Sequence, residues 1–329
     1  MNTEHNSSSN SQTPELSVCI VSWNTKELLG NCLESVFADP RSERWEVIVV
    51  DNASTDGSAE MVEQRFPGAT LVASATNLGF ARANNVAMER AAGRCFLLLN
   101  SDTRVHEGAL GGIVALMDEH DDMGAAGPML LNDDESLQPS CGSSPSLRSE
   151  TVRKLLLHRL LPSFKRSHES HRDRQNVDWV TGACLFVKRD VVSRVGPLDP
   201  EIFMFYEDIE WCLRIRRAGW KIGYHPGFQV IHLGGQSTRK NLEAMLVTSQ
   251  RSLYYLFQRH FSGLTLQALR GLTVVEMVLR TVMWTGVYLM RPGVREEGGQ
   301  RLRAYRTILR RTIFDRNYWA PVTRQTTEP

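Results

Sequence analysis

The chain has 329 residues, a formal net charge of +1 and 23% charged residues. This length suits one large α/β domain or two modest ones, and a net charge so close to zero provides no general attraction for nucleic acid. The six cysteines form no CxxC pair and several lie in apolar runs. We therefore expect buried, reduced thiols rather than a disulfide framework or a zinc site.

Strand and helix patterns alternate over the first two thirds of the chain. Residues 1–14 are polar and lack the apolar segment of a signal peptide, so we expect a disordered tail. Buried strands are expected at Leu16–Trp23, Glu46–Asn52, Ala69–Ser74, Arg94–Asp102 and Gly124–Leu130. Helices are expected between them at Lys26–Phe37, Ser58–Phe66, Gly79–Gly93, with Gly93 as the stop signal, and Glu107–His120. Such alternation predicts an open α/β sheet with helices packed on it.

The alternation breaks at residues 132–176, which are rich in Ser, Pro, Arg and His. We expect a partly mobile insertion over the sheet edge, with one helical piece at Leu147–Leu161. Order resumes with a strand at Ala183–Arg189, a helix at Tyr206–Ala218 that ends at Gly219, and two extended segments, KIGYHPG and FQVIHLGG. From residue 241 onward the chain is expected to be helical and basic.

Polar clusters stand at three of the expected strand ends. They are Ser22-Trp23-Asn24, Asp51-Asn52-Ala53-Ser54 and Asn100-Ser101-Asp102. Turns favour the same residue types, so one such end is weak evidence. Ligands of open α/β sheets bind beyond the carboxyl ends of strands, so three polar ends together favour a site. No GxGxxG follows the first strand, which removes the main support for a dinucleotide-binding oxidoreductase.

Three acidic residues and one histidine are candidates for chemistry. Asp102 would emerge from the end of a buried strand. A lone carboxylate there suits a hard divalent cation that also takes diphosphate oxygens as ligands. The alternative is that Asp102 caps the helix at 107–120. Glu207 and Asp208 begin a helix after an aromatic run. Burial there would raise a carboxyl pKa and make a better base, and favourable charge at the helix dipole is the alternative. His232 is either a structural histidine or the neighbour of a metal held by Asp102.

The motifs VSWNT, VVDNASTDGS, NLGFARANN, LLLNSD, DWVTGACLFVKR, FMFYEDIEWCLR and VIHLGGQST follow one another along the chain. This series closely resembles family-two glycosyltransferases of the GT-A fold, in the rhamnosyltransferase-like branch, over about Leu16 to Thr238. The resemblance implies a Rossmann-like open mixed sheet flanked by helices as the catalytic domain at 15–240, with the insertion at 132–176. Residues 241–329 would form a helical C-terminal extension.

The resemblance also implies an activity. The enzyme would be an inverting transferase that moves a sugar from a nucleotide-diphosphate sugar to an acceptor hydroxyl. The favoured donor is dTDP-rhamnose, and the favoured acceptor is a lipid-linked glycan in cell-surface polysaccharide synthesis. No nucleic acid partner is implied. Mg²⁺ or Mn²⁺ would be the cofactor.

Individual roles follow from the same resemblance, motif by motif. Asp51 and Arg82 should contact the nucleotide base, in a pocket shaped by Ser22, Asn24, Asn77 and Gly79. NSD matches the family's DxD, so Asp102 should bind metal together with His232, and Asn100 should lie near the ribose. Asn100 stands where the family usually has its first Asp, which removes one carboxylate. The acceptor and donor-sugar side would be lined by Trp179, Thr181, Gly182 and Ala183. Asp208 matches the catalytic base, with Glu207 in support.

Other classes of protein fit less well. A processive polysaccharide synthase would carry spanning helices and a QxxRW motif, which the sequence does not indicate. A non-catalytic nucleotide-sugar-binding module would keep the nucleotide contacts without the acids at positions 102, 207 and 208. A nucleotidyltransferase would want a Gly-rich, Lys-bearing phosphate loop, for which VSWNTKELLG is a poor match. The binding module and the nucleotidyltransferase are the alternatives to a glycosyltransferase.

The C-terminal segment has a membrane-surface pattern. Leu264–Met290 is apolar, but Arg270, Glu276 and Arg280 interrupt it, so we do not expect a simple spanning helix. Arginines then alternate with apolar and aromatic residues as far as Trp319, which suits a helix in a membrane interface. We expect peripheral contact of 264–319 with the cytoplasmic face of the cell membrane. The alternative is that these helices pack on the catalytic domain or on a second subunit.

Overall fold

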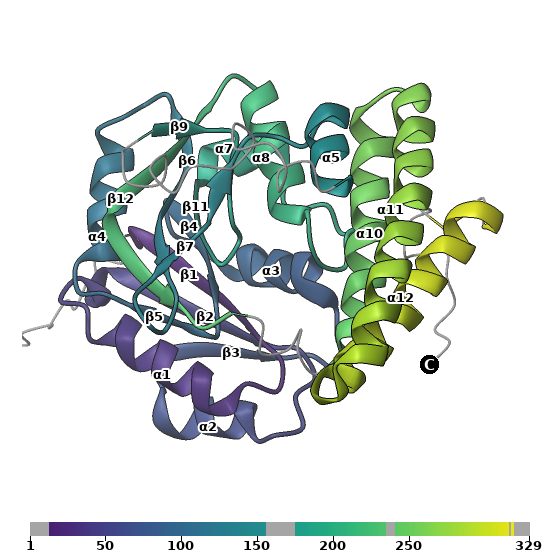
Figure 1. Ribbon diagram of the computed structural model, residues 1–329. Coiled ribbons are helices and arrows are strands. Elements are labelled where there is room, and N and C mark those ends of the chain that lie inside the picture. The colour runs from purple at the N-terminus through teal and green to yellow at the C-terminus, as the bar shows by residue number, and fades with distance from the viewer. Residues whose placement is uncertain (1–12, 156–174, 235–240, 316, 319–329) are drawn as a thin grey trace, which may run out of the picture.

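The computed structural model describes residues 13–155, 175–234, 241–315 and 317–318, and within them ten strands form one mixed sheet (Figure 1). Its main strands lie in the order β3 (Ala69–Ala73), β2 (Trp45–Asp51), β1 (Leu16–Ser22), β4 (Cys95–Asn100), β11 (Cys184–Lys188), β6 (Met123–Leu131), β12 (Lys221–His232) and β5 (Thr103–Val105). The first four are parallel, and β11 runs antiparallel to both β4 and β6. The short strands β7 (Leu137–Gln138) and β9 (Gln175–Val177) pair with β6 and β12.

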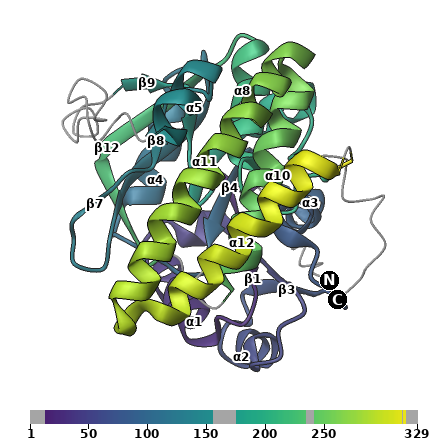
Figure 2. The same ribbon diagram turned by 45° about the vertical axis from the view of Figure 1, so that its right-hand side comes forward.

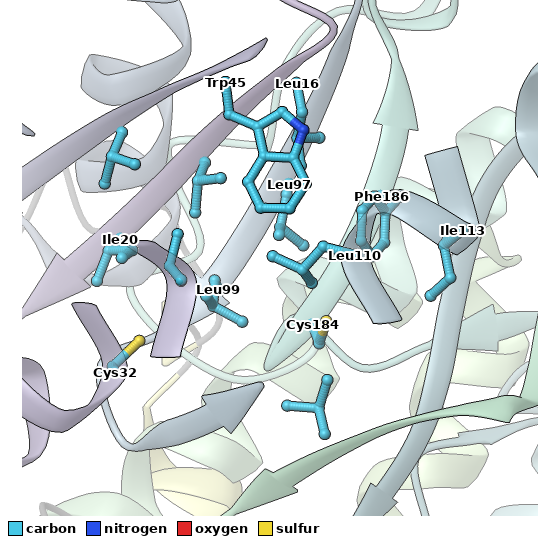
Figure 3. Packing of buried hydrophobic residues seen from close by; sticks show 14 of the residues in the cluster. Leu16, Ile20, Cys32, Trp45, Leu97, Leu99, Leu110, Ile113, Cys184 and Phe186 are labelled. Carbon is cyan, nitrogen blue, oxygen red and sulfur yellow. The ribbon is translucent and has the colours of Figure 1, made fainter. Parts of the chain in front are cut away.

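Helices cover both faces of the sheet, each over its own hydrophobic core. On one face lie α1 (Lys26–Phe37), α2 (Ser58–Arg65) and α4 (Ala109–Asp118). On the other lie α3 (Gly79–Arg90), α7 (Arg189–Val195) and α8 (Glu207–Arg217). Successive side chains of a strand point to opposite faces. Leu97 of β4 therefore enters the first core, with Trp45 and Phe186 (Figure 3), whereas Leu98 enters the second.

The C-terminal part is a layer of three helices beside the sheet (Figures 1 and 2). They are α10 (Leu242–His260), α11 (Gly263–Met290) and α12 (Arg295–Phe314). Side-chain bonds join α10 to the catalytic part, since Tyr255 donates to Asp199 at 2.9 Å and the His260 ring meets Glu210 at 2.8 Å. The short helix α5 (Leu147–Lys154) packs against α11. The layer is thus attached directly to α8 (Glu207–Arg217) and to the loop that precedes it.

The expected strand and helix alternation is confirmed, with a few differences. The helix from Gly79 ends at Arg90, so Gly93 is not its stop signal. Gly93 is needed for packing instead, because a Cβ there would lie 2.4 Å from the Ser17 hydroxyl oxygen. Gly219, at φ 96°, does follow the end of α8 in the left-handed region that favours glycine. The two extended segments after it form a single strand, β12, with a register irregularity between His225 and Gln229.

The segment 132–176 is more tightly joined to the sheet than we expected. Its strand β7 and the start of β9 belong to the main sheet, and β8 (Cys141–Gly142) forms a separate two-stranded sheet with β10 (Trp179–Val180). Its helix ends at Lys154, and residues 156–161 of the expected helix lie outside the described residues, as does most of the expected tail. The helix α7 was not expected, because seven residues show too little periodicity to identify it. The six cysteines are buried free thiols, as predicted.

Candidate active site

A cavity of about 1550 Å³ opens at the carboxyl ends of the central strands. It gathers eleven of the residues singled out in the sequence: Asn77, Gly79, Asn100, Asp102, Trp179, Thr181, Gly182, Ala183, Glu207, Asp208 and His232. They come from five separate motifs, so the fold brings the motifs together in one place. This position agrees with the rule that open α/β sheets bind ligands beyond their strand ends.

Four other predicted residues do not line this cavity. Ser22 is buried and shares a hydrogen bond with Thr25 at 2.9 Å, and Asn24 accepts from the Thr55 amide at 2.8 Å. The Arg82 guanidinium donates to the Pro200 carbonyl at 2.7 Å. Asp51 is buried at the end of β2, and its Oδ1 has no hydrogen-bond partner among the described residues. A buried acceptor without a donor suits a ligand N–H, so Asp51 keeps its predicted role of contacting the base as a proposal.

Asp102 and His232 lie side by side at the cavity wall. Asp102 Oδ1 is 3.2 Å from His232 Nε2, and the helix α4 begins after Gly108, so Asp102 does not cap it. The backbone joins the same two segments, because the Leu233 amide donates to the Asp102 carbonyl at 2.9 Å. The structure therefore pairs the two residues that the sequence offered as metal ligands.

A hydrogen-bond chain orients the His232 ring. The Gln138 amide nitrogen donates to Asn132 Oδ1 and to the His232 carbonyl, so Gln138 Oε1 faces His232 Nδ1 at 2.7 Å and accepts its proton. In the neutral ring, this arrangement leaves the Nε2 lone pair toward Asp102, and the side-chain amide nitrogen of Asn100 lies 3.2 Å from Nε2. A lone pair beside a carboxylate favours a cation between them. In the described ranges no three His, Cys, Asp or Glu side chains gather, so other ligands of such a cation would come from substrate or water.

Asp208 stands at the first turn of α8, on another part of the cavity wall. Its Oδ2 accepts from the Gly182 amide at 2.9 Å and its Oδ1 from the Ile209 amide at 2.7 Å. Burial raises the pKa of this carboxyl above its ordinary value, although these hydrogen bonds oppose the shift. The backbone N–H of Asn100 donates to the Ala183 carbonyl at 3.0 Å. The loop Thr181–Ala183 thus connects the carboxylate of Asp208 to the segment that carries Asp102.

Glu207 lies beside Asp208 but in a drier environment. Its side chain is buried, and Oε2 has no hydrogen-bond partner among the described residues. Burial and the charge of Asp208 raise the Glu207 pKa well above its ordinary value. Asp208 has two amide donors and Glu207 Oε2 has none, so Asp208 is the first of the two carboxyls to lose its proton.

The loop before α8 is held in a strained conformation. Phe205 and Tyr206 both line the cavity and have φ of 68° and 66°. Bulky residues rarely adopt this region, which costs about 1–3 kcal/mol each. The loop packs on Gly79, where a Cβ would lie 2.4 Å from the Phe203 carbonyl oxygen, and the Phe80 amide donates to that oxygen at 2.7 Å. This contact explains the glycine of NLGF and helps to fix Asp208.

Several residues of the site escaped the sequence analysis. Gln138 comes from the segment 132–176, which carried no motif, and its role depends on a contact with a residue far along the chain. Asn52 is buried at the cavity and accepts from the Leu78 amide at 2.7 Å, which ties VVDNAS to NLGF. Arg148 and Arg153 of α5 also line the cavity. Only Asn52 had a signal in the sequence, as part of a polar strand end.

The mixed sheet, the polar strand ends and the carboxylates around one cavity define a nucleotide-sugar-type glycosyltransferase fold, GT-A. The profile of "Glycosyl transferase family 2" matches residues 17–196, more than half of the chain. The chain therefore belongs to glycosyl transferase family 2 and is a glycosyltransferase. The matched part ends before α8, so Asp208 and His232 lie outside it.

Curated relatives agree with this family, and a solved structure agrees with the fold. An N-acetylglucosaminyl-diphospho-decaprenol L-rhamnosyltransferase of Mycobacterium tuberculosis is 28% identical over 254 residues, which cover 71% of this chain and 81% of the relative. Rhamnosyltransferase WbbL of Escherichia coli is 27% identical over 240 residues, or 68% and 84% of the two chains. A mannosyltransferase of Pyrobaculum calidifontis, solved with GDP-Man and Mn²⁺, superposes with a TM-score of 0.56 at 18% identity, covering 93% of this chain and 89% of that one.

Proposed function

We propose that this enzyme transfers a sugar, with dTDP-rhamnose as the favoured donor, to a hydroxyl of a lipid-linked glycan in cell-surface polysaccharide synthesis, with inversion at the anomeric carbon. One observation carries the proposal: Asp208, with its raised carboxyl pKa, faces the same cavity as the Asp102–His232 pair. A base and a diphosphate-binding position on one cavity are what this reaction requires. The names of the two rhamnosyltransferase relatives support the choice of donor sugar.

The residues of this chain would divide the work as follows. Asp208 takes the proton of the acceptor hydroxyl while the oxygen bonds to the anomeric carbon and the bond to the leaving diphosphate breaks. The Gly182 amide and the strained loop hold Asp208 in position. Attack from the face opposite the leaving group inverts the centre, so no covalent sugar–enzyme intermediate is needed.

The donor diphosphate would lie at Asp102 and His232. These two residues fit Mg²⁺ or Mn²⁺ bound jointly with diphosphate oxygens, because a carboxylate oxygen and a ring lone pair converge there. Such a cation supplies Lewis-acid stabilisation of the charge on the leaving diphosphate. The Mn²⁺ in the Pyrobaculum mannosyltransferase supports this assignment.

A donor screen tests the proposal directly. Purified full-length protein would be incubated with a panel of nucleotide sugars, with and without Mn²⁺, and donor hydrolysis would be measured. We expect hydrolysis of one or a few nucleotide-diphosphate sugars, and release of the opposite anomer by NMR. Nucleotidyl transfer from a sugar phosphate, or binding of donors without any turnover, would overturn the proposal.

Turnover is expected to fall at acidic pH, from a point above the pKa of about 3.9 typical of Asp. Asp208 acts as a base only when ionised, and burial raises its pKa, so activity is present above the raised value and is lost as the pH falls through it. The pH profile of kcat would be measured under donor saturation. An acidic limb at or below the ordinary aspartate value would contradict the assignment of Asp208 in this environment.

An exposed apolar face on α11 supports peripheral membrane attachment. Nine of its large apolar side chains are exposed: Leu264, Val275, Val278, Leu279, Val282, Met283, Tyr288, Leu289 and Met290. With 3.6 residues per turn, all of them except Tyr288 fall along one side of the helix. A face of this kind, which no element among the described residues covers, suits insertion into the interface of a bilayer.

The charges that interrupt this helix in the sequence lie on its other side. Glu276 is buried and bonds to Arg280 at 2.9 Å, and Arg270 donates to the Thr312 carbonyl at 2.7 Å. By length and composition alone, residues Gly263–Met290 could also cross a membrane. We favour attachment along the cytoplasmic face, because a spanning α11 would carry its charged contacts and α12 into the bilayer.

Replacing Val282 with Glu is expected to weaken binding to phosphatidylglycerol vesicles by about tenfold, since this side chain is 70% exposed on the apolar face. Co-sedimentation of full-length protein gives the measurement. Gln64→Glu, which places the same charge on the exposed surface of α2, serves as the control and should bind like the wild type. Equal binding by both variants would exclude this face as the anchor.

A further inference from the structure

The helix α5 presents two arginines to the active-site cavity. Arg148 and Arg153 both line it, and among the described lining residues they are the only Lys or Arg. Arg148 has no ion pair within the described part of the chain. Arg153 pairs with Glu150, which is itself buried. These two arginines and Glu150 together give this part of the cavity wall a net positive charge.

A buried ion pair fixes α5 in this position. Lys154 Nζ lies 2.6 Å from Glu276 Oε2 of α11 and 3.1 Å from Gln250 Oε1 of α10, and its side chain is fully buried. Burial alone would raise the pKa of the Glu276 carboxyl, but the charge and the hydrogen bond of Lys154 hold this pKa below its usual value. Breaking such a pair would leave a buried charge without a partner. The helix α5 lies beside α11 (Figures 1 and 2), so Lys154 anchors α5 to the C-terminal layer. The arginines of α5 line the cavity.

The arginines lie toward the catalytic base. Arg153 and Tyr206 line the same cavity, and Leu147 of α5 packs with Tyr206 against one hydrophobic cluster, so α5 lies close to the residue that directly precedes Glu207 and Asp208. The donor diphosphate already has its position at Asp102 and His232. An anion at the arginines would therefore belong to the second substrate, whose hydroxyl must reach Asp208.

We propose that Arg148 and Arg153 bind the diphosphate that links the acceptor sugar to its lipid. The inference rests on the proposed function and names the group by which that acceptor is recognised. Guanidinium groups bind phosphate oxygens through paired N–H donors. An acceptor sugar would lie between the arginines and Asp208, and the lipid would leave beside α5 toward α11. The acceptor named for the mycobacterial relative, a sugar-diphospho-decaprenol, has this chemistry.

Equilibrium binding of farnesyl diphosphate to the full-length protein tests the proposal without any need to know the acceptor sugar. We expect saturable binding that the double variant Arg148→Gln/Arg153→Gln weakens about 10–100-fold, as for the loss of charged hydrogen bonds. The matched control is Arg65→Gln/Arg90→Gln, which removes the same charge from exposed positions on α2 and α3 and should leave binding unchanged. Farnesol, which lacks the diphosphate, should bind weakly and equally to all three proteins.

A second arm separates the two substrates. Binding of dTDP with Mn²⁺ should be the same in the arginine double variant as in the wild type. Equal weakening of dTDP and farnesyl diphosphate would assign the arginines to the donor and overturn the proposal, as would farnesyl diphosphate binding that the variant does not change. If the proposed function itself were wrong, the wild-type protein would show no donor hydrolysis.

Discussion

Replacing Asp208 with Asn is expected to lower kcat about 10²–10⁴-fold, because the amide cannot take the proton of the acceptor hydroxyl. Both Asp208 oxygens accept backbone N–H bonds, and Asn can keep one of them, so the loop should hold its shape. Nucleotide binding should stay close to that of the wild type. Transfer would be measured under donor saturation, together with the Kd for the nucleoside diphosphate.

Glu207→Gln is the matched control for this experiment. Burial and the charge of Asp208 raise the pKa of Glu207 well above its usual value, so a neutral amide of the same size should preserve most of the turnover. The contrast between neighbouring residues separates proton transfer from damage to the start of α8. Near-normal turnover in Asp208→Asn would reject Asp208 as the base, and equal loss in both variants would indicate a positional effect instead.

Removal of divalent metal is expected to abolish transfer. EDTA should stop the reaction, and Mn²⁺ or Mg²⁺ should restore it, because the leaving diphosphate needs its charge neutralised. Asp102→Ala should weaken binding of the nucleotide-diphosphate sugar far more than binding of the bare nucleoside, which carries no phosphate. Full activity in the chelator would overturn the metal assignment and the role of His232 with it.

The contact between Gln138 and His232 gives this prediction a readout that does not depend on activity. Gln138→Leu removes the acceptor that holds the His232 Nδ1 proton, so Mn²⁺ affinity should fall about 10–100-fold. Titration followed by electron paramagnetic resonance, in the presence of nucleoside diphosphate, measures this affinity. Gln64→Glu again serves as a control on a distant surface. Unchanged Mn²⁺ affinity in Gln138→Leu would show that the ring needs no such support.

The sequence by itself determined the order of strands and helices and the chemical character of the site. Apolar spacing is a local property, and it marked Lys26–Phe37 as a helix with the same bounds that the structure shows. The polar residues after buried strands were also legible, because a strand that ends in Asn-Ser-Asp must place these groups at the sheet edge. Short elements such as α7, and the end of α3 before Gly93, depend on packing and were missed or misplaced.

Only the tertiary structure decided which of these groups meet. The 3.2 Å approach of Asp102 to His232 depends on the antiparallel pairing of β5 with β12, which no local pattern specifies. The arginines of α5 reach the cavity because Lys154 finds a buried partner on α11. The same contact turns Glu276 inward and leaves one side of α11 apolar. Local sequence sets the chemistry of a side chain, but its partners depend on how distant elements pack.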